Sequence, residues 1–285
     1  MANLSLGLDF STQSLTAVLL DIDSGETIYT HSLDYTLDKR LKGSGLRDDF
    51  IVPPRIAGEA DQPPELFFKA LDAILSDLKQ AEIKLAEVRV INNSSQQHGH
   101  VYLSGEAPGI FSRLNKKTFT EQNDLADLMA GSLAYGTAPI WRTSNTADQA
   151  GAVRDRVGGT ERMIRLSGSN SPLRFTGAVV RRVAEQFPKA YRDTYKIHLI
   201  SSLITGILSG NSDAPIDFGN ACGMSLMNYR RKTWSADLIK ATAHGLPGGE
   251  RALRNKLPGL GPPDLIVGTI AEYFVAKYDF EPGCK

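Results

Sequence analysis

The chain has 285 residues, of which 41% are hydrophobic and 22% are charged, as in ordinary globular proteins. Its 32 basic and 32 acidic residues cancel, so neither a nucleic-acid-binding protein nor a membrane-surface protein is indicated. No apolar run approaches the roughly 18 residues that span a bilayer, and Cys222 and Cys284 are too few for a disulfide framework or a zinc site. We therefore expect a cytoplasmic protein without a signal peptide, whose partners are small molecules.

The first 30 residues predict three short strands joined by tight turns. Leu4, Leu6 and Leu8 occupy alternate positions, as in a strand with one buried face. The segments 17–20 and 27–30 supply a second and a third strand, with an Asp-Ser-Gly turn between them. We expect these strands to form an antiparallel meander.

A long connection from Asp34 to Pro64 follows, rich in charge, glycine and proline, and connections of this length are often functional. A helix is predicted to begin near Pro64, because apolar residues then recur at helical spacing as far as Leu78. The short apolar segment 88–91 predicts a strand. It leads directly into the polar segment 92–100, which we expect to be a loop.

The remainder of the chain is predicted to be mainly helical. Apolar residues recur at helical spacing in segments 125–130, 147–157, 161–166, 178–187, 197–208, 235–241 and 271–278. Thr160, Thr176 and Ser235 are suited to cap three of these helices. Two further strands are predicted at 223–229 and 265–270. The order of elements indicates one α/β or α+β domain with a helical insertion.

The first candidate site is the segment that follows the first strand and contains Asp9, Ser11, Thr12 and Gln13. Hydroxyls and backbone amides in a tight turn can donate to phosphate oxygens, and a carboxylate can hold Mg²⁺ through water. Taken alone, the segment is better explained as an ordinary β-turn, and it matches neither a Walker A loop nor a dinucleotide-binding motif.

The second candidate site is the polar loop with Gln96, Gln97, His98 and His100. Two amides and two imidazoles offer many donors and acceptors, which suits a polyhydroxylated ligand. The alternatives are a plain polar loop or a pair of metal ligands at the two histidines. A metal pair is disfavoured because no third ligand is evident nearby.

Two charged residues complete the candidates. Arg174 precedes a predicted helix and could bind an anion or a hydroxyl, although a structural ion pair is the commoner role for such a residue. Asp217 lies in a turn bracketed by proline and glycine and could act as a general base towards a hydroxyl. In isolation, a turn-forming role is the better explanation of Asp217.

Together these segments resemble the FGGY family of carbohydrate kinases, and within it the xylulokinase branch. Residues 9–14 are similar to the family's first phosphate motif, 95–99 to its substrate loop, and 174–177 to a segment with a sugar-contacting arginine. Residues 214–217 are similar to the stretch around the catalytic aspartate, and 267–270 continue the likeness, which covers nearly the whole chain.

The sequence departs from the family pattern in two places. Trp141-Arg142 is followed by Thr143, where many members have an aspartate, which puts the role of that carboxylate and the identity of the substrate in doubt. The resemblance also stops before the family's Gly-Asp-Asn motif and its nucleotide-binding lobe. It therefore implies that residues 1–285 are an N-terminal sugar-binding lobe and that the C-terminal lobe is absent from this chain.

The resemblance implies an α/β fold of the actin, Hsp70 and hexokinase type (ribonuclease H-like), with a mixed five-stranded sheet, flanking helices and insertions. It implies ATP- and Mg²⁺-dependent phosphorylation of a ketopentose, with O5 of D-xylulose as the expected acceptor, and an inactive isolated lobe. The implied roles are the general base for Asp217, sugar contacts for Gln97, His98 and Arg174, water-mediated Mg²⁺ binding for Asp9, and phosphate contacts for Ser11, Thr12 and Gln13. These roles require Asp9, His98, Arg174 and Asp217 to lie along one wall of a single open groove.

Three other interpretations compete with this one. The first is another FGGY kinase, acting on ribulose, glycerol or a sugar acid. The second is a non-catalytic actin-like binding domain, which would not require Asp217. The third is a metal-dependent hydrolase that uses His98, His100 and Asp9. Exposed apolar surface where a second lobe would pack also allows a homo-oligomer.

Overall fold

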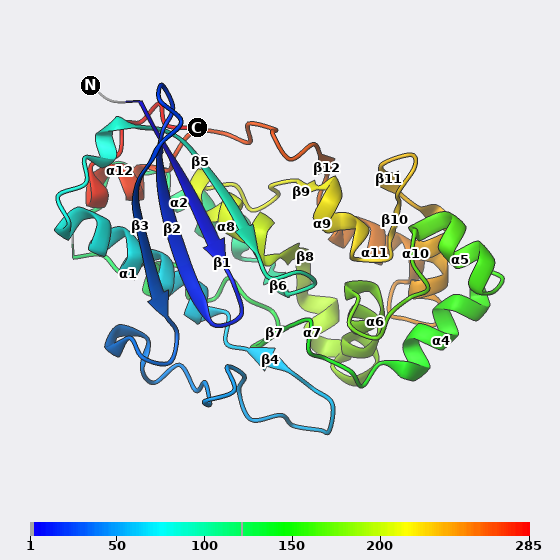
Figure 1. The fold of residues 1–285 in the computed structure, drawn as a ribbon. Coiled ribbons are helices and arrows are strands. Elements are labelled where there is room, and N and C mark those ends of the chain that lie inside the picture. The colour runs from blue at the N-terminus through cyan, green and yellow to red at the C-terminus, as the bar shows by residue number, and fades with distance from the viewer. Residues whose placement is uncertain (1–2, 121) are drawn as a thin grey trace.

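The chain folds around a mixed sheet of four strands, shown in Figure 1 for the computed structural model, which describes residues 3–120 and 122–285. The strands lie in the order β3 (Thr27–Asp34), β2 (Ser14–Asp21), β1 (Leu4–Phe10) and β5 (Val88–Ser95). β1, β2 and β3 form the predicted antiparallel meander, and β5 runs parallel to β1. The carboxyl ends of β1 and β5 therefore lie side by side at the same end of the sheet.

The sheet differs from prediction in its number of strands. Four strands are hydrogen-bonded together among the described residues, rather than the five expected. At the free edge of β5, the amide of Ile91 donates to the carbonyl of Lys285 at 2.7 Å, and the amide of Lys285 donates to the carbonyl of Arg89 at 3.0 Å. A single residue with two such hydrogen bonds is too short to form a strand.

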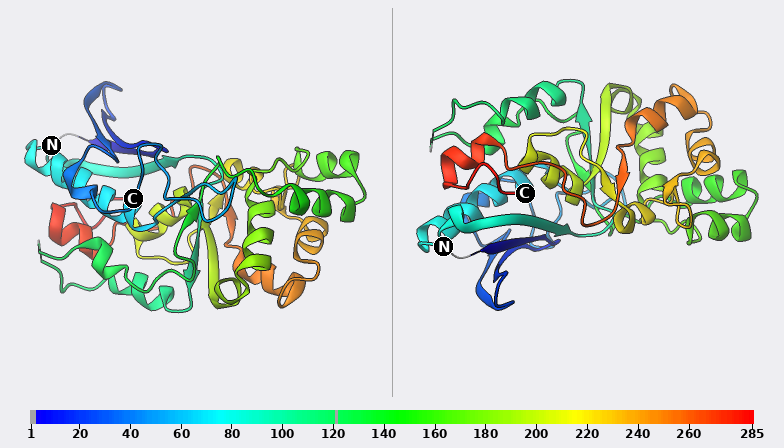
Figure 2. Two further views of the ribbon diagram at one scale, coloured as in Figure 1. Left: turned by 90° about the horizontal axis from the view of Figure 1, so that it is seen from below. Right: turned by 90° about the horizontal axis from the view of Figure 1, so that it is seen from above.

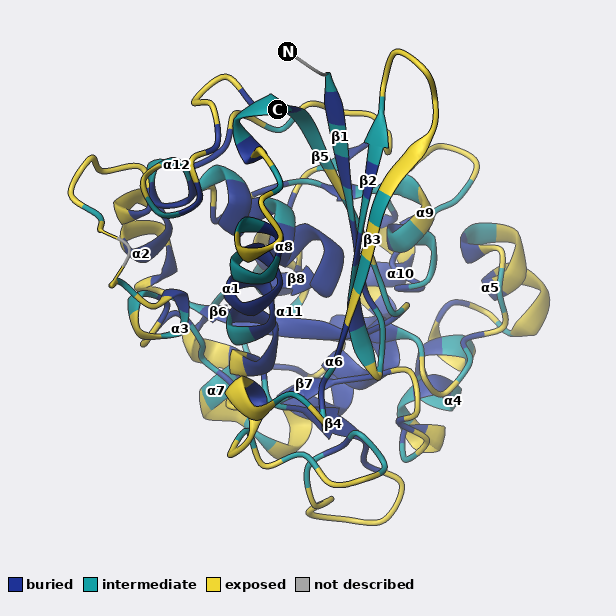
Figure 3. Ribbon diagram, turned by 60° about the vertical axis from the view of Figure 1, so that its left-hand side comes forward, coloured by how far each residue is buried: buried dark blue, intermediate teal, exposed yellow. Residues whose placement is uncertain are grey.

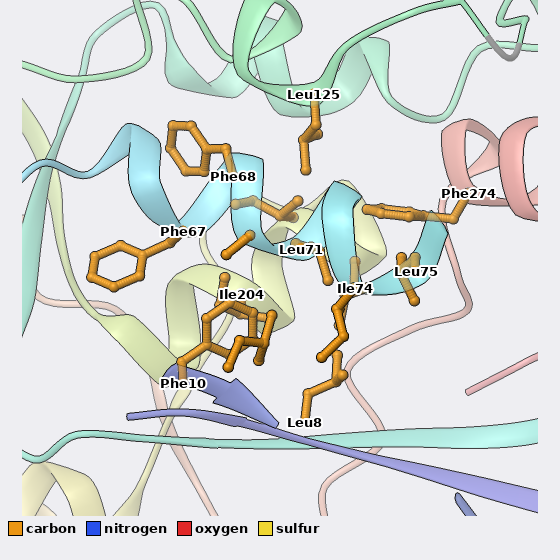
Figure 4. Packing of buried hydrophobic residues seen from close by; sticks show 14 of the residues in the cluster. Leu8, Phe10, Phe67, Phe68, Leu71, Ile74, Leu75, Leu125, Ile204 and Phe274 are labelled. Atoms are coloured by element: carbon orange, nitrogen blue, oxygen red, sulfur yellow. The ribbon is translucent and has the colours of Figure 1, made fainter. Parts of the chain in front are cut away.

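The main core lies between one face of this sheet and two helices, α1 (Glu65–Gln80) and α8 (Ile200–Ser209). Alternate residues of β1 are buried, as the sequence pattern predicts, because only one face of the strand points to the helices. In Figure 4, Leu8 of β1 lies below Ile74 of α1, and Phe10 of β1 lies beside Ile204 of α8. The outermost strand at the opposite side of the sheet from β5 is β3, which is largely accessible to solvent (Figure 3).

A second core lies beyond the sheet, around the antiparallel pair β6 (His100–Ser104) and β8 (Thr194–Leu199). Its helices are α6 (Thr176–Gln186), α7 (Pro188–Asp193), α10 (Ala236–Ala243) and α11 (Gly249–Lys256). Figure 2 shows α4 (Ala147–Arg156) and α5 (Thr160–Ser167), in green, at the end of the molecule opposite the blue strands. The helices of this second core thus extend away from the sheet, whereas α8 packs against the face of the sheet.

The other elements are short. Two-residue ladders pair β4 (Asp61–Gln62) with β7 (Ala138–Pro139), β9 (Ile216–Asp217) with β12 (Leu260–Gly261), and β10 (Met227–Asn228) with β11 (Thr233–Trp234). The remaining short elements are η1 (Lys39–Leu41), η2 (Leu85–Glu87), α2 (Ala107–Arg113), α3 (Leu125–Leu128), α9 (Phe218–Cys222) and α12 (Glu272–Tyr278). No helix in the described ranges is long and apolar enough to cross a membrane.

Several predicted elements are wrong in type or extent. The helix predicted at 197–208 is strand β8 followed directly by helix α8, because a continuous apolar run cannot distinguish a buried strand from a buried helix. Segment 265–270 is not a strand, and Leu265 and Ile266 are 46% and 60% exposed. The strand predicted at 223–229 is reduced to β10.

The predicted helix caps have mixed outcomes. Ser235 caps α10 as predicted, since its hydroxyl accepts a hydrogen bond from the amide of Leu238. The caps of α5 and α6 are instead Gly159 and Phe175, one residue before the predicted threonines, and neither makes a side-chain capping bond. Pro64 precedes α1 as predicted.

Candidate functional site

A cavity of about 420 Å³ opens where the carboxyl ends of β1 and β5 meet. Its wall contains six of the predicted site residues, which are Asp9, Ser11, Thr12, Gln97, His98 and Arg174. The parallel pairing of β1 and β5 explains this arrangement, because it places the turn after one strand beside the loop after the other. The fold thus joins the predicted phosphate turn and the predicted sugar loop in one cavity.

The turn after β1 is closed by its own hydrogen bonds. The backbone amide and the hydroxyl of Ser11 both donate to the carbonyl of Ser14, at 2.9 and 3.1 Å. Asp9 accepts a hydrogen bond at Oδ1 from the Ser94 hydroxyl, at 2.5 Å, which ties the end of β1 to β5. Gln13 does not line the cavity; it is exposed, and its carbonyl accepts from Tyr35.

The backbone of His98 lies in the left-handed region, with φ of 66°. A residue other than glycine adopts this conformation at a cost in free energy, so surrounding contacts must hold it there. The carbonyl of His98 accepts from Nδ1 of His100 at 2.9 Å and from the Thr176 hydroxyl at 3.3 Å. Its ring lies 4.4 Å from that of Phe175, and its Nδ1 lies 3.0 Å from the carbonyl oxygen of Gly223.

Charge and burial at the site favour a neutral imidazole at His98, and the guanidinium of Arg174 has no partner among the described residues. Burial lowers the pKa of His98, and the positive charge of Arg174 lowers it further, while the Gly223 carbonyl acts in the opposite direction. Arg174 itself is exposed on the cavity wall and makes no hydrogen bond or ion pair with another described residue. Its guanidinium is therefore available to a ligand.

Trp141 also lines the cavity, although the sequence analysis treated it only as a departure from the family pattern. Its side chain is 44% exposed, and its indole Nε1 donates to the Thr12 hydroxyl at 2.9 Å. An indole ring held in this way offers an apolar surface beside the polar groups of the loop. The signal in the sequence that could have identified this residue was a tryptophan inside a motif that the resemblance had already marked.

Gln62, a second residue missed by sequence reasoning, is hydrogen-bonded to the two segments that line the cavity. Its side chain is fully buried, and its Nε2 donates to the carbonyls of Thr12 and Phe50, both at 2.8 Å. Its Oε1 accepts from Nε2 of Gln96 at 2.6 Å, and Oε1 of Gln96 accepts from the Thr12 hydroxyl at 3.1 Å. Through these bonds the long connection 34–64 supports both the phosphate turn and the sugar loop.

Asp217 lies outside this cavity, contrary to the expectation that it shares one groove with Asp9, His98 and Arg174. It lines a neighbouring cavity of about 430 Å³ beside β5 and α8. The linings of the two cavities are in contact, because Ser94, which lines the second cavity, donates to Asp9, which lines the first. Both carboxylate oxygens of Asp217 accept hydrogen bonds from Asn220, at 2.9 and 2.7 Å, so the carboxylate caps α9.

The metal-site interpretation of the two loop histidines lacks a ligand set. His100 is completely buried, and its two ring nitrogens are hydrogen-bonded to the His98 carbonyl and to the Tyr102 hydroxyl. Burial lowers the pKa of His100 to about 4, which keeps the ring neutral. In the described part of the chain, no group of three His, Cys, Asp or Glu side chains could hold a metal ion.

Comparison with known proteins identifies relatives over the whole chain. No family model matches. A xylulose kinase of Saccharomyces cerevisiae is 32% identical over 284 residues, which are 98% of this chain and 45% of that protein. The crystal structures of gluconate kinase and of ligand-bound xylulose kinase from Lactobacillus acidophilus superpose with TM-scores of 0.74 and 0.72, at 18% and 19% identity. They cover 100% and 99% of this chain and 47% of each structure.

The two kinds of comparison support different conclusions. The solved structures confirm the predicted fold class, that of the actin- and hexokinase-like sugar kinases, but at this identity they say nothing about the sugar. The chain spans about half the length of the curated relatives it matches. Over nearly its whole length the chain is therefore similar to curated xylulose kinases, in agreement with the predicted resemblance to the FGGY family of carbohydrate kinases.

Proposed function

We propose that this chain is the N-terminal, sugar-binding lobe of an ATP-dependent kinase that phosphorylates a ketopentose, with O5 of D-xylulose as the preferred acceptor. The observation that carries the proposal is one cavity with a hydroxyl-rich turn on one side and His98 with Arg174 on the other. The names of the curated relatives support the choice of D-xylulose. Free Cys222 and Cys284 are consistent with a reducing, cytoplasmic location.

In this proposal the sugar lies between Trp141 and the loop after β5. Gln97, His98 and Arg174 make hydrogen bonds to its oxygens, and the indole of Trp141 covers an apolar part of the carbon chain. Among the described residues of the cavity wall, Arg174 is the one permanently charged donor, and Asp9 is the acidic residue that balances it. A neutral polyol suits this wall because it needs no further charge compensation.

The phosphoryl group of ATP lies over the turn after β1. The backbone amide of Thr12 has no partner among the described residues and donates to its oxygens. The amide and hydroxyl of Ser11 and the hydroxyl of Thr12 contact the phosphate only by giving up their bonds to Ser14 and Gln96. Gln13 keeps its proposed phosphate role although it lies outside the cavity wall. Asp9 fits water-mediated Mg²⁺, because its Oδ2 has no partner among the described residues and Mg²⁺ keeps several waters and phosphate oxygens as ligands. A bound Mg²⁺ would supply charge neutralisation at the phosphates.

The general-base role of Asp217 stays a prediction, and the contacts of its carboxylate favour a positioning role. If Asp217 is the base, Asp217→Asn should abolish turnover in a complete kinase and leave sugar binding intact. If Asp217 caps α9, the asparagine keeps an acceptor for the cap, and turnover should fall by less than about tenfold.

The test of the proposed function is a calorimetric titration of the chain with D-xylulose, D-ribulose, glycerol and gluconate. We expect weak but measurable binding of D-xylulose, because half of a closing cleft supplies only part of the contacts. Arg174→Met should abolish the response, while Arg192→Met, at an exposed arginine of α7, should not. Stronger binding of gluconate would favour a sugar-acid kinase, and a normal rate of xylulose phosphorylation by the chain alone would contradict the assignment as one lobe.

A further inference from the structure

The contacts around His98 restrict its ring to one hydrogen-bonding state. A carbonyl oxygen only accepts hydrogen bonds, so the 3.0 Å contact between Nδ1 and the Gly223 carbonyl requires a hydrogen on Nδ1. In a neutral imidazole the other nitrogen then has no hydrogen and is an acceptor. Nε2 has no hydrogen-bond partner within the described ranges, and His98 lines the cavity.

The surroundings keep this ring neutral. His98 is 8% exposed, and burial is the main cause that lowers its pKa. Three ionisable groups lie around it. Arg174, before α6, opposes a positive charge; His100 of β6 is itself neutral; and Asp9 of β1 lines the same cavity and carries the only negative charge among them.

Gly223 is required for the ring position rather than for its own backbone conformation. Its φ of −69° and ψ of −4° are open to any residue. A Cβ at this position would lie 2.7 Å from Cε1 and 2.8 Å from Nδ1 of His98, which is closer than real contacts allow. Only glycine therefore lets the carbonyl at the end of α9 reach Nδ1. Phe175 closes the other side of the ring.

We propose that Gly223, at the end of α9, is a positioning residue that holds His98 as its Nδ1-protonated tautomer, so that Nε2 acts as a fixed acceptor in the cavity. Arg174 beside it only donates. A ligand must then give a hydroxyl hydrogen to His98 and an acceptor oxygen to Arg174, as a hydroxyketone or polyol does. A group that only accepts, such as a carboxylate, is rejected at His98. The choice of a sugar as ligand rests on the proposed function, whereas the tautomer does not.

The tautomer is measured directly by long-range ¹H–¹⁵N correlation spectra of the chain with ¹⁵N-labelled histidine. The signal of His98 is assigned by its loss in His98→Asn, and His244→Asn, at an exposed histidine, is the matched control. We expect an Nδ1-protonated, Nε2-bare pattern from about pH 8 down to about pH 6.5, the ordinary pKa of histidine. An Nε2-protonated or charged ring at neutral pH would overturn the proposal.

Two variants test the positioning role and the ligand. Gly223→Ala should give a mixture of tautomers and at least a tenfold weaker response to D-xylulose, whereas Gly109→Ala, in open space on α2, should change neither. If Gly223→Ala does not fold, His98→Asn decides: its amide can still donate to Gly223, but it lacks the distal acceptor, so D-xylulose binding should be lost.

The outcomes separate this inference from the proposed function. The expected tautomer without any response to D-xylulose would support the assignment of His98 and Gly223 and would overturn D-xylulose as the ligand. D-xylulose binding by a chain whose His98 is protonated at Nε2, or unchanged binding in His98→Asn, would overturn the inference and leave the kinase proposal standing.

Discussion

Replacing Gln62 with methionine tests whether the long connection 34–64 supports the cavity. Methionine has a similar length and fills the same buried space, but it can neither donate nor usefully accept hydrogen bonds. The variant therefore leaves the carbonyls of Thr12 and Phe50 without their donor and Nε2 of Gln96 without its acceptor. The turn after β1 and the loop after β5 lose their shared support at the same time.

The expected loss of stability follows from these three bonds. Each lost hydrogen bond in a partly buried place costs about 1 kcal/mol, and leaving the partner unsatisfied accounts for most of that cost. Burial of the apolar methionine side chain offsets about 1 kcal/mol of the total. We therefore expect Gln62→Met to lower the free energy of unfolding by about 2 kcal/mol. We also expect it to weaken D-xylulose binding by about tenfold, since Thr12 and Gln96 both line the cavity.

Urea unfolding followed by far-UV circular dichroism measures the stability, and calorimetry measures the binding. Gln80→Met is the matched control, because Gln80 is exposed at the end of α1 and the same substitution there should change neither quantity. Tryptophan fluorescence provides a local signal, since Trp141 donates to Thr12. An unfolding free energy within about 0.5 kcal/mol of that of the parent chain, with unchanged D-xylulose binding, would show that Gln62 does not support the cavity.

Three further predictions concern buried groups. Asp72→Ala removes a carboxylate that accepts hydrogen bonds from two tyrosines, a backbone amide and Lys277. It should lower the free energy of unfolding by about 3–5 kcal/mol, because the Lys277 ammonium is left buried without its counter-charge. Adding Lys277→Met should then restore much of the lost stability. Burial lowers the pKa of His100 and His198 to about 4, so only the unfolded chain gains these protons below about pH 6.5. The unfolding free energy should then fall towards pH 4 by up to about 1.4 kcal/mol per pH unit for each histidine, and His198→Gln should reduce this slope in urea unfolding. Gly177→Ala would place a Cβ 2.7 Å from the Met224 carbonyl at the start of α6, so a loss of about 1–3 kcal/mol and weaker D-xylulose binding are expected, and an unchanged melting curve would contradict this.

The position of Asp217 illustrates why candidate residues found separately in sequence need not act together. The turn around it, its side chain and its order in the chain all fitted a catalytic role. In the structure, however, Asn220, three residues later, engages both carboxylate oxygens, and the side chain lines a different cavity from His98. Membership of a cavity depends on where a turn is placed by the rest of the fold, which local composition does not encode.

Local sequence was sufficient where burial follows a simple period. Alternation in β1 predicted the meander, helical spacing after Pro64 predicted α1, and the chemistry of Asp9, His98 and Arg174 marked three residues that share a cavity. Each of these signals lies within a few neighbouring residues, because a strand or helix with one buried face repeats its apolar positions at a fixed interval.

Tertiary structure decided the features that depend on distant partners. Segment 197–208 begins as a strand because β8 pairs with β6, about a hundred residues earlier in the chain. Trp141 and Gly223 are bonded to cavity residues 129 and 125 positions away, and Gln62 is bonded to one 50 positions away. Such contacts leave no period in the local sequence, since they form only when the folded backbone brings the two segments together.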